Sequence, residues 1–196
     1  MGLKVAIFPL HLWLPNAYTY APSAITSFLA ATATKVAIYV MLRFLFSVFQ
    51  PGFLAEVPTL DLLLYPFAIL AMFAASYTAI LQRDLKRMLA YSSLGQVGYM
   101  LLGVALLSES GLMATMIHLF NHGITKAALF MGVGVYVLNG GGSFYHNLRR
   151  RGKTMPWTSA AMVVAGLSLI GVPGTAGFLS KWLLVEAALA QGMWPI

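Results

Sequence analysis

The chain has 196 residues, of which 60% are hydrophobic and 9% are charged, and its formal net charge is +7. In soluble domains about a quarter of all residues are charged, so this composition excludes an ordinary soluble domain. The absence of Cys excludes a disulfide framework and a thiolate metal site. No basic tract is interleaved with aromatic residues, as a nucleic-acid surface would require.

Apolar stretches of roughly 20 residues recur, and that is the length a helix needs to cross a bilayer. Because open sheet edges cannot face lipid, the expected fold class is all-α, a polytopic transmembrane helix bundle with broken helices. The pattern predicts about five full spans plus a partial one at the start. We treat residues 1–196 as a single transmembrane domain.

The first apolar segment, residues 1–14, is too short for a comfortable span. Pro9 and Pro15 should break or end it, because proline lacks the backbone donor that a helix needs. These prolines and His11 also disfavour a signal peptide, so we expect the chain to begin inside or at the edge of a membrane helix. A polar connector is predicted over residues 16–22.

Longer apolar segments follow in order. The predicted spans are residues 23–49, 60–82, 88–107, 112–138 and 157–190, and the first four are separated by turns at 50–58, 83–87 and 108–111. The basic stretches RDLKR (83–87) and RRRGK (149–153) flank two of these spans, so both should lie on one side of the membrane. The positive-inside rule assigns that side to the cytoplasm and accounts for the net charge.

The last span is interrupted by the sequence GVPGTAG at residues 171–177. Pro173 and its neighbouring glycines should break the helix and free backbone groups, which persist in a membrane only where protein or a water-filled cavity satisfies them. A simple packing kink is the alternative. Lys181 and Glu186 follow the break, but a spacing of five residues does not favour a direct pair on one helix.

Several charged residues lie inside predicted spans, where a charge costs about 2.5–3.5 kcal/mol at mid-bilayer. Residue counting at about 1.5 Å per residue places Lys35 and Lys126 near mid-depth. Arg43 lies nearer a helix end, from which a long side chain can reach the interface. The two mid-depth lysines therefore require a reason to be there.

His118, His122 and Lys126 are spaced by four residues and so share one stripe of a helix, over roughly 12 Å of its length. The favoured interpretation is a proton path, because His titrates near neutral pH and a desolvated Lys can release its proton. One alternative is structural: the histidines would bond neighbouring helices and Lys126 would pair with a carboxylate. A second alternative is a zinc site on His118 and His122, which the positive charge of the adjacent Lys126 disfavours.

Five stretches of the chain together resemble a known family. They are KVAIFPLHLWLP, LAATATKVAIYVMLRF, RDLKRMLAYSSLGQVGYM, HLFNHGITKAALF and GVPGTAGFLSKW. They are similar to the proton-translocating antiporter-like membrane subunits of respiratory NADH:quinone oxidoreductase, membrane-bound hydrogenases and multisubunit cation/proton antiporters. Lys181 and MPWT at 155–158 make the D-type subunit of the antiporters the nearest match.

The resemblance implies a proton relay at mid-membrane. Its residues would be Lys4, Lys35, His118, His122 and Lys126, and the helix-break and accessory positions would be Pro9, Pro173, Lys181 and Glu186. The resemblance implies no cofactor in this chain, so any redox chemistry would belong to partner subunits, and an enzymatic role would be that of a translocase subunit. The expected partners are other membrane subunits, the lipid bilayer, protons and possible Na⁺ or K⁺ ions, without nucleic acid.

The expected function is proton conduction, or exchange of a monovalent cation for protons, in a prokaryotic inner membrane. The alternatives are a proton-pumping subunit of an oxidoreductase or hydrogenase and a scaffold that no longer transports. The resemblance implies further helices before residue 1 and after residue 196, so we expect either a fragment or the product of a split gene. We therefore expect the central part of an antiporter-like subunit.

Overall fold

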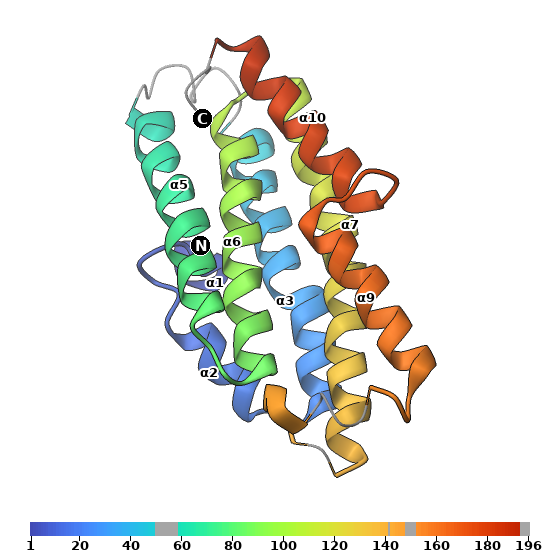
Figure 1. The fold of residues 1–196 in the computed structure, drawn as a ribbon. Helices are drawn as coiled ribbons and strands as arrows, with labels where there is room; N and C mark the ends of the chain where they lie inside the picture. Colours follow the sequence, from blue (N-terminus) through green and yellow to red (C-terminus); the bar gives the residue numbers. More distant parts are fainter. Residues whose placement is uncertain (50–58, 141, 148–151, 193–196) are drawn as a thin grey trace.

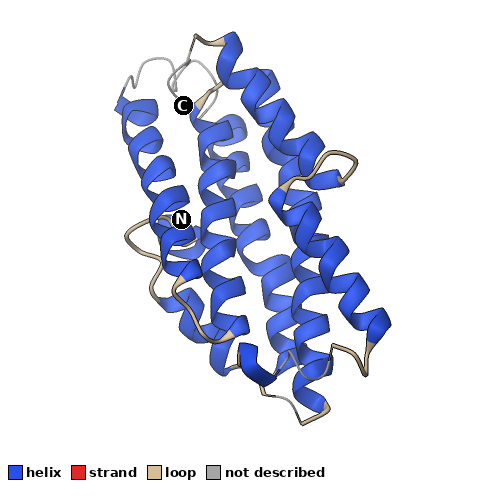
Figure 2. Ribbon diagram, in the orientation of Figure 1, coloured by secondary structure: helices blue, strands red, loops and turns tan. Residues whose placement is uncertain are grey.

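The computed structural model describes residues 1–49, 59–140, 142–147 and 152–192. Within these ranges every regular element is a helix, and no strand is formed (Figure 2). The elements are α1 (Gly2–Val5), α2 (Trp13–Tyr20), α3 (Ser23–Arg43), the π-helix η1 (Phe44–Val48), α5 (Thr59–Ile80), α6 (Leu85–Ala105), α7 (Glu109–Leu138), α9 (Pro156–Ile170) and α10 (Ala176–Ala190). The all-α prediction is confirmed.

The long helices run side by side along the bundle, with α6, α3 and α7 inside it and α5 on one flank (Figure 1). Helix α7 contacts α3, α6, α9 and α10, whereas α5 packs mainly against α6. Helix α6 is buried on nearly all sides, and its Gly98 packs so closely on α5 that a Cβ atom would lie 2.8 Å from Ala68 O. The centre of the bundle is thus the junction of α3, α6, α7 and α10.

Three helices are long and apolar enough to cross a membrane within the part of the chain described: Ser23–Val48, Leu63–Ile80 and Leu85–Ala105. Helix α7 has 30 residues but is not among them, because its His, Asn and Lys residues lower its mean hydropathy. Helices α9 and α10 are each 15 residues long, so only the pair could span a bilayer. Spans at α7 and at α9–α10 stay predictions.

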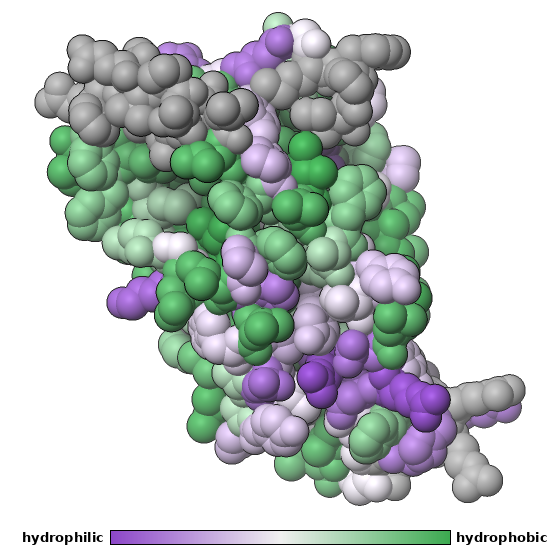
Figure 3. Space-filling model, turned by 90° about the vertical axis from the view of Figure 1, so that its left-hand side faces the viewer, coloured by the Kyte–Doolittle hydropathy of each residue, from purple (hydrophilic) through white to green (hydrophobic). Residues whose placement is uncertain are grey.

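The outer face around α5 is largely apolar. Figure 3 shows this flank, with hydrophobic side chains over much of its upper half and hydrophilic side chains gathered at the lower right. Large apolar side chains such as Phe73, Tyr77 and Ile80 are more than half exposed there. Such a surface suits contact with lipid or with further helices.

Residues 13–20 form helix α2 where a polar connector was predicted over residues 16–22, so that prediction was wrong. Proline is tolerated in the first turn of a helix, where Pro15 lies. Thr19 Oγ1 donates to Pro15 O at 2.7 Å, and Lys86 Nζ donates to Ala21 O at 3.3 Å just beyond the helix. Lys86 is only 7% exposed although it lies in the stretch predicted as a basic link.

The two turns that follow α5 and α7 meet at one end of the bundle. Leu85 N donates to Ser143 O at 2.8 Å, Tyr145 N donates to Arg83 O at 3.3 Å, and Ser143 Oγ donates to the Asp84 carboxylate. Asp84 also caps α6 by accepting from Arg87 N. The stretches that carry the basic residues therefore start from the same end, as predicted, although Arg149, Arg150 and Arg151 lie outside the described residues.

Candidate functional site

Helix α7 turns its three titratable residues toward the centre of the bundle. His118, His122 and Lys126 are 6%, 2% and 0% exposed. The spacing of four residues keeps them on one face, which packs against α6, α3 and α10. The predicted stripe is therefore a buried line of titratable groups.

Lys126 is held by α6 through neutral acceptors. Its Nζ donates to Leu89 O at 2.7 Å and to Ser92 Oγ at 2.5 Å. Among the acidic residues whose side chains the structure describes, Glu109 and Glu186 are exposed, and Asp84 bonds Ser143 and Arg87 N at the start of α6. No described carboxylate pairs with Lys126, so the structural alternative of a buried ion pair finds no support there.

His122 lies in the middle of the line and has no hydrogen-bond partner on either ring nitrogen. A buried donor and a buried acceptor left unpaired together cost several kcal/mol, and native proteins normally pair such groups, often with ordered water. The ring lies parallel to that of His118, with centroids 6.0 Å apart and planes at 4°. Lys35, Lys126 and Lys181 all lie near enough to act on it electrostatically.

His118 is bonded on both sides. Its Nε2 lies 2.9 Å from Gln96 Oε1 of α6, and its Nδ1 lies 2.9 Å from Ser180 Oγ of α10. The Tyr99 ring meets the imidazole nearly edge-on, with centroids 6.2 Å apart. This histidine therefore joins α6, α7 and α10 at one end of the line.

Lys35 of α3 faces the same line and is 4% exposed. Its Nζ donates to Ala30 O of its own helix. It lines a hollow of about 270 Å³ together with Gly123 and other residues of α7. A Cβ atom on Gly123 would lie 3.2 Å from Ala31 O, so α3 and α7 approach closely beside this lysine.

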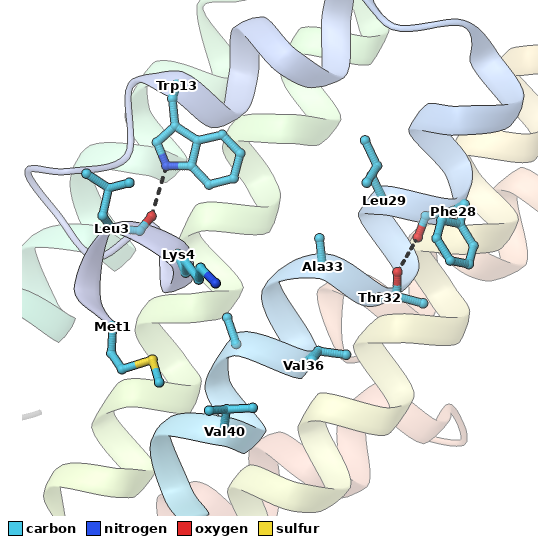
Figure 4. Close-up of a pocket in the computed structure, with 11 residues that line it drawn as sticks. Met1, Leu3, Lys4, Trp13, Phe28, Leu29, Thr32, Ala33, Val36 and Val40 are labelled. Atoms are coloured by element: carbon cyan, nitrogen blue, oxygen red, sulfur yellow. Dashed lines mark hydrogen bonds between the residues drawn. The ribbon is translucent and has the colours of Figure 1, made fainter. Parts of the chain in front are cut away.

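Lys4 does not join the buried line. It is exposed on the short helix α1 and lines a pocket of about 580 Å³ against the outer face of α3 (Figure 4). Trp13 Nε1 donates to Leu3 O at 3.0 Å and closes one wall of this pocket. The structure thus groups Lys35 with the α7 residues and leaves Lys4 on the opposite side of α3.

The two predicted breaks both lie between helices. Pro9 falls between α1 and α2, and Pro173 falls between α9 and α10. Lys181 Nζ donates at 3.0 Å to Leu169 O and to Ile170 O, the last carbonyls of α9, where a cation also complements the helix dipole. Its Nζ lies 5.0 Å from the centre of the Tyr99 ring. Glu186 is exposed, and the structure does not bring it to the line.

Sequence reasoning missed Ser92, Gln96 and Ser180, which supply the side-chain partners of the line. Gln96 is a polar residue within an apolar helix, and Ser180 directly precedes Lys181, so both carried a weak signal. Nothing in the sequence showed that these residues face α7. Within the described ranges, no group of three or more His, Cys, Asp or Glu side chains is placed to hold a metal ion.

A family model described as NADH:quinone oxidoreductase/Mrp antiporter, TM matches residues 1–196. The chain belongs to this family. It is therefore an integral membrane protein, as predicted from its composition. The resemblance drawn from the five motifs is confirmed.

Curated relatives come from both branches of the family. The chain is 42% identical over 99% of its length to the N subunit of the NADH-quinone oxidoreductase of Desulforudis audaxviator, of which it covers 38%. It is 35% identical over 95% of its length to the D-type subunit of the Na(+)/H(+) antiporter of Alkalihalophilus pseudofirmus, of which it covers 37%. The chain thus spans less than two fifths of each of these relatives.

Two solved structures are similar to the fold. A chain of the membrane-bound sulfane sulfur reductase, an archaeal respiratory membrane complex, gives a TM-score of 0.84 at 36% identity, over 95% of this chain and 38% of that one. A chain of the Mrp complex from Dietzia sp. DQ12-45-1b gives 0.86 at 30% identity, over 99% of this chain and 35% of that one.

Proposed function

We propose that this chain conducts protons as part of a membrane subunit, through a relay formed by Lys35, Lys126, His122 and His118. The observation that carries the proposal is His122, buried between cationic side chains with both ring nitrogens free of partners. A purely structural histidine would have its ring nitrogens paired with hydrogen-bond partners. Two free nitrogens suit a group that accepts a proton on one side and releases it on the other.

The relay would work through bound water. Neighbours four residues apart on α7 are separated by about 6 Å along the axis, which is too far for a direct hydrogen bond between most rotamers. Water can bridge such gaps at little cost in free energy when polar partners are available. The two free nitrogens of His122 offer polar partners for such water.

The charge on each lysine would depend on its neighbours. Lys35 acts electrostatically on both His122 and Lys126, so a proton gained at one site disfavours a proton at the next. Both buried lysines bond neutral acceptors rather than carboxylates. A scaffold that does not transport has no use for such groups, which favours transport over the scaffold alternative.

In the complete protein we expect either exchange of a monovalent cation such as Na⁺ or K⁺ for protons, as the relative from the Na(+)/H(+) antiporter suggests, or proton pumping by an oxidoreductase. The 42% identity to an oxidoreductase subunit supports the second function. A strain lacking the operon separates them. Loss of sodium/proton exchange supports antiport, and loss of NADH-linked or hydrogen-linked proton pumping with exchange unchanged supports the oxidoreductase.

Other membrane subunits are the expected partners, in a prokaryotic inner membrane. The similar structures belong to multisubunit complexes, the sulfane sulfur reductase and the Mrp complex. The apolar outer faces and the pocket that holds Lys4 leave surface for further helices of the same protein or of neighbouring subunits. Lys4 is proposed to join the relay only once such helices cover it.

The test of the relay is Lys126→Met in the complete complex reconstituted in vesicles. The change keeps the apolar stem of the side chain and removes the charge, and the proposal requires loss of most proton transport with assembly intact. Leu119→Ala is the matched control, since Leu119 lies one position off the stripe and is partly buried. Wild-type transport by Lys126→Met over about pH 6 to 8, where His titrates, would reject the relay.

A further inference from the structure

Three buried polar side chains close the end of the line between α6, α7 and α10. Gln96, His118 and Ser180 are 8%, 6% and 0% exposed. Both bonds of the imidazole, to Gln96 Oε1 and to Ser180 Oγ, measure 2.9 Å. These two partners decide what the histidine can do with a proton.

Gln96 fixes the tautomer of His118. An amide oxygen can only accept a hydrogen bond, so the proton of the neutral ring must sit on Nε2 and point at Gln96. That nitrogen cannot pass a proton on, because an amide oxygen is a very weak base. The remaining site of exchange is Nδ1, whose partner is the Ser180 hydroxyl.

His122 offers no direct route to Nδ1. The two imidazole rings lie parallel with centroids 6.0 Å apart, and neither nitrogen of His122 bonds His118. Tyr99 meets the ring near its edge but forms no described hydrogen bond with it. A proton on Nδ1 therefore leaves through Ser180, and it can reach His122 only through water bound between the two residues.

Ser180 has two acceptors for its one proton. Its Oγ lies 3.1 Å from Gly177 O in the first turn of α10, besides 2.9 Å from His118 Nδ1. With neutral His118, the hydroxyl donates to Nδ1. With protonated His118, Nδ1–H donates to Ser180 Oγ, and the hydroxyl proton is free to turn to Gly177 O.

We propose that His118 exchanges its proton through the Ser180 hydroxyl, and that Gln96 is the positioning residue that directs exchange to this side. In the step, the O–H bond of Ser180 breaks as the Nδ1–H bond forms, and the Ser180 oxygen takes a second proton from a hydronium ion at the α9–α10 break, which leaves neutral water there. Two protons shift, the net gain of His118 is one proton, and no electron is transferred. Exchange at His118 is thus directed toward α10, and the inference rests on the proposed relay.

Several groups face this site and must be considered in a pH profile. His122 lies on α7, Tyr99 on α6, Lys35 on α3 and Lys181 on α10. Variants at Ser180 and Gln96 alter none of these groups. Ser180→Ala, Ser180→Thr and Gln96→Leu also add no titratable group, so a change in the profile that these three produce can be assigned to His118.

The experiment measures proton transport by the complete complex in vesicles over about pH 6 to 8. Ser180→Ala removes the hydroxyl and should lower the rate roughly tenfold or more, since positioned proton transfer contributes factors of this size or greater. Ser180→Cys and Ser180→Thr keep a group that can donate and accept, and either should restore part of the rate. Ser27→Ala is the control, because Ser27 is also buried and bonds only Ser23 O of its own helix.

Gln96→Glu tests the positioning role. A carboxylate accepts the same Nε2–H bond but favours the protonated ring, so the rate–pH profile should move toward higher pH while assembly is unchanged. Gln96→Leu removes the acceptor and should lower the rate without this displacement. If His118 takes no part in proton exchange, both variants should lower the rate at most and leave the profile unchanged, which would reject the inference.

The outcomes separate this inference from the relay itself. If Lys126→Met abolishes transport while Ser180→Ala transports like wild type, the relay stands and exchange through Ser180 is rejected. If Lys126→Met transports like wild type, the relay fails and this inference fails with it. If both variants lose transport and Ser27→Ala does not, both proposals are supported.

Discussion

The ammonium nitrogen of Lys126 lies 2.5 Å from the hydroxyl of Ser92, which links the centre of α7 to α6. Ser92→Ala removes one of the two acceptors of Lys126 and leaves Leu89 O. We expect transport to fall severalfold, less than in Lys126→Met, because the lysine keeps its charge and one bond. Thr78→Ala is the control, since Thr78 Oγ1 bonds only backbone of α5. Equal loss in both variants would contradict a specific role for Ser92.

Lys35 provides the second prediction. Lys35→Ala should abolish most transport in the complete complex while leaving insertion intact, because the relay loses its member on α3. Lys35→Arg should also impair transport, since arginine stays protonated and cannot pass its proton on. Arg43→Ala, at the exposed end of the same helix, should transport like wild type. Full transport by Lys35→Ala would return this lysine to a packing role.

His122→Phe is the third prediction. The change keeps the bulk of the ring and removes both unpartnered nitrogens. It should relieve the core of two unsatisfied polar atoms and so leave stability equal or higher, while transport is lost. Thermal unfolding and vesicle transport of the same preparation measure both quantities. A variant that loses stability as well as transport would indicate that bonded water at His122 is mainly structural.

Gly177 and Gly166 form a matched pair for the contact between α9 and α10. A Cβ atom on Gly177 would lie 1.7 Å from Ser168 O, whereas one on Gly166 would meet nothing within 4 Å. Gly177→Ala should destabilise the protein by about 1–3 kcal/mol through overpacking. Gly166→Ala should be neutral or stabilise by about 0.5–1 kcal/mol, since Ala is the better helix former. Similar melting temperatures for the two variants would contradict this packing.

Topology can be tested with single cysteines, since the natural chain has none. Arg83→Cys and Lys153→Cys should be labelled by an impermeant reagent from the cytoplasmic side, because both residues belong to the basic loops. Glu109→Cys, at the exposed start of α7, should be labelled from the opposite side. Labelling of Arg83→Cys and Lys153→Cys from different sides would reject the assigned spans.

The stripe on α7 could be predicted because helical spacing alone decides which residues share a face. Its partners could not, because the sequence does not say which helices surround α7 or how they are rotated. Gln96 and Ser180 are therefore visible only in the structure. The resemblance placed Lys4 in the relay, but α1 has four residues and lies outside α3, which leaves this lysine exposed.

Asn121 and Thr125 illustrate the same limit. Both polar residues lie beside the stripe, where such side chains could hold water, but both donate to backbone oxygens instead. Asn121 Nδ2 donates to Ala176 O at the start of α10, and Thr125 Oγ1 donates to Asn121 O, each at 2.8 Å. A polar residue beside the line of titratable groups can bond the backbone of a broken helix and need not hold water. Residue type and spacing do not distinguish these two roles.

The hydrogen bonds between residues 83–85 and 143–145 have a mechanical consequence. They fasten the turn before α6 to the segment after α7 by two backbone bonds and one side-chain bond to Asp84. Sliding α7 along α6 would break them, at about 0.5–1.5 kcal/mol for each bond. A displacement of α7 too small to break these bonds would carry the turn along with it. These bonds therefore couple the start of α6 mechanically to the segment that follows α7.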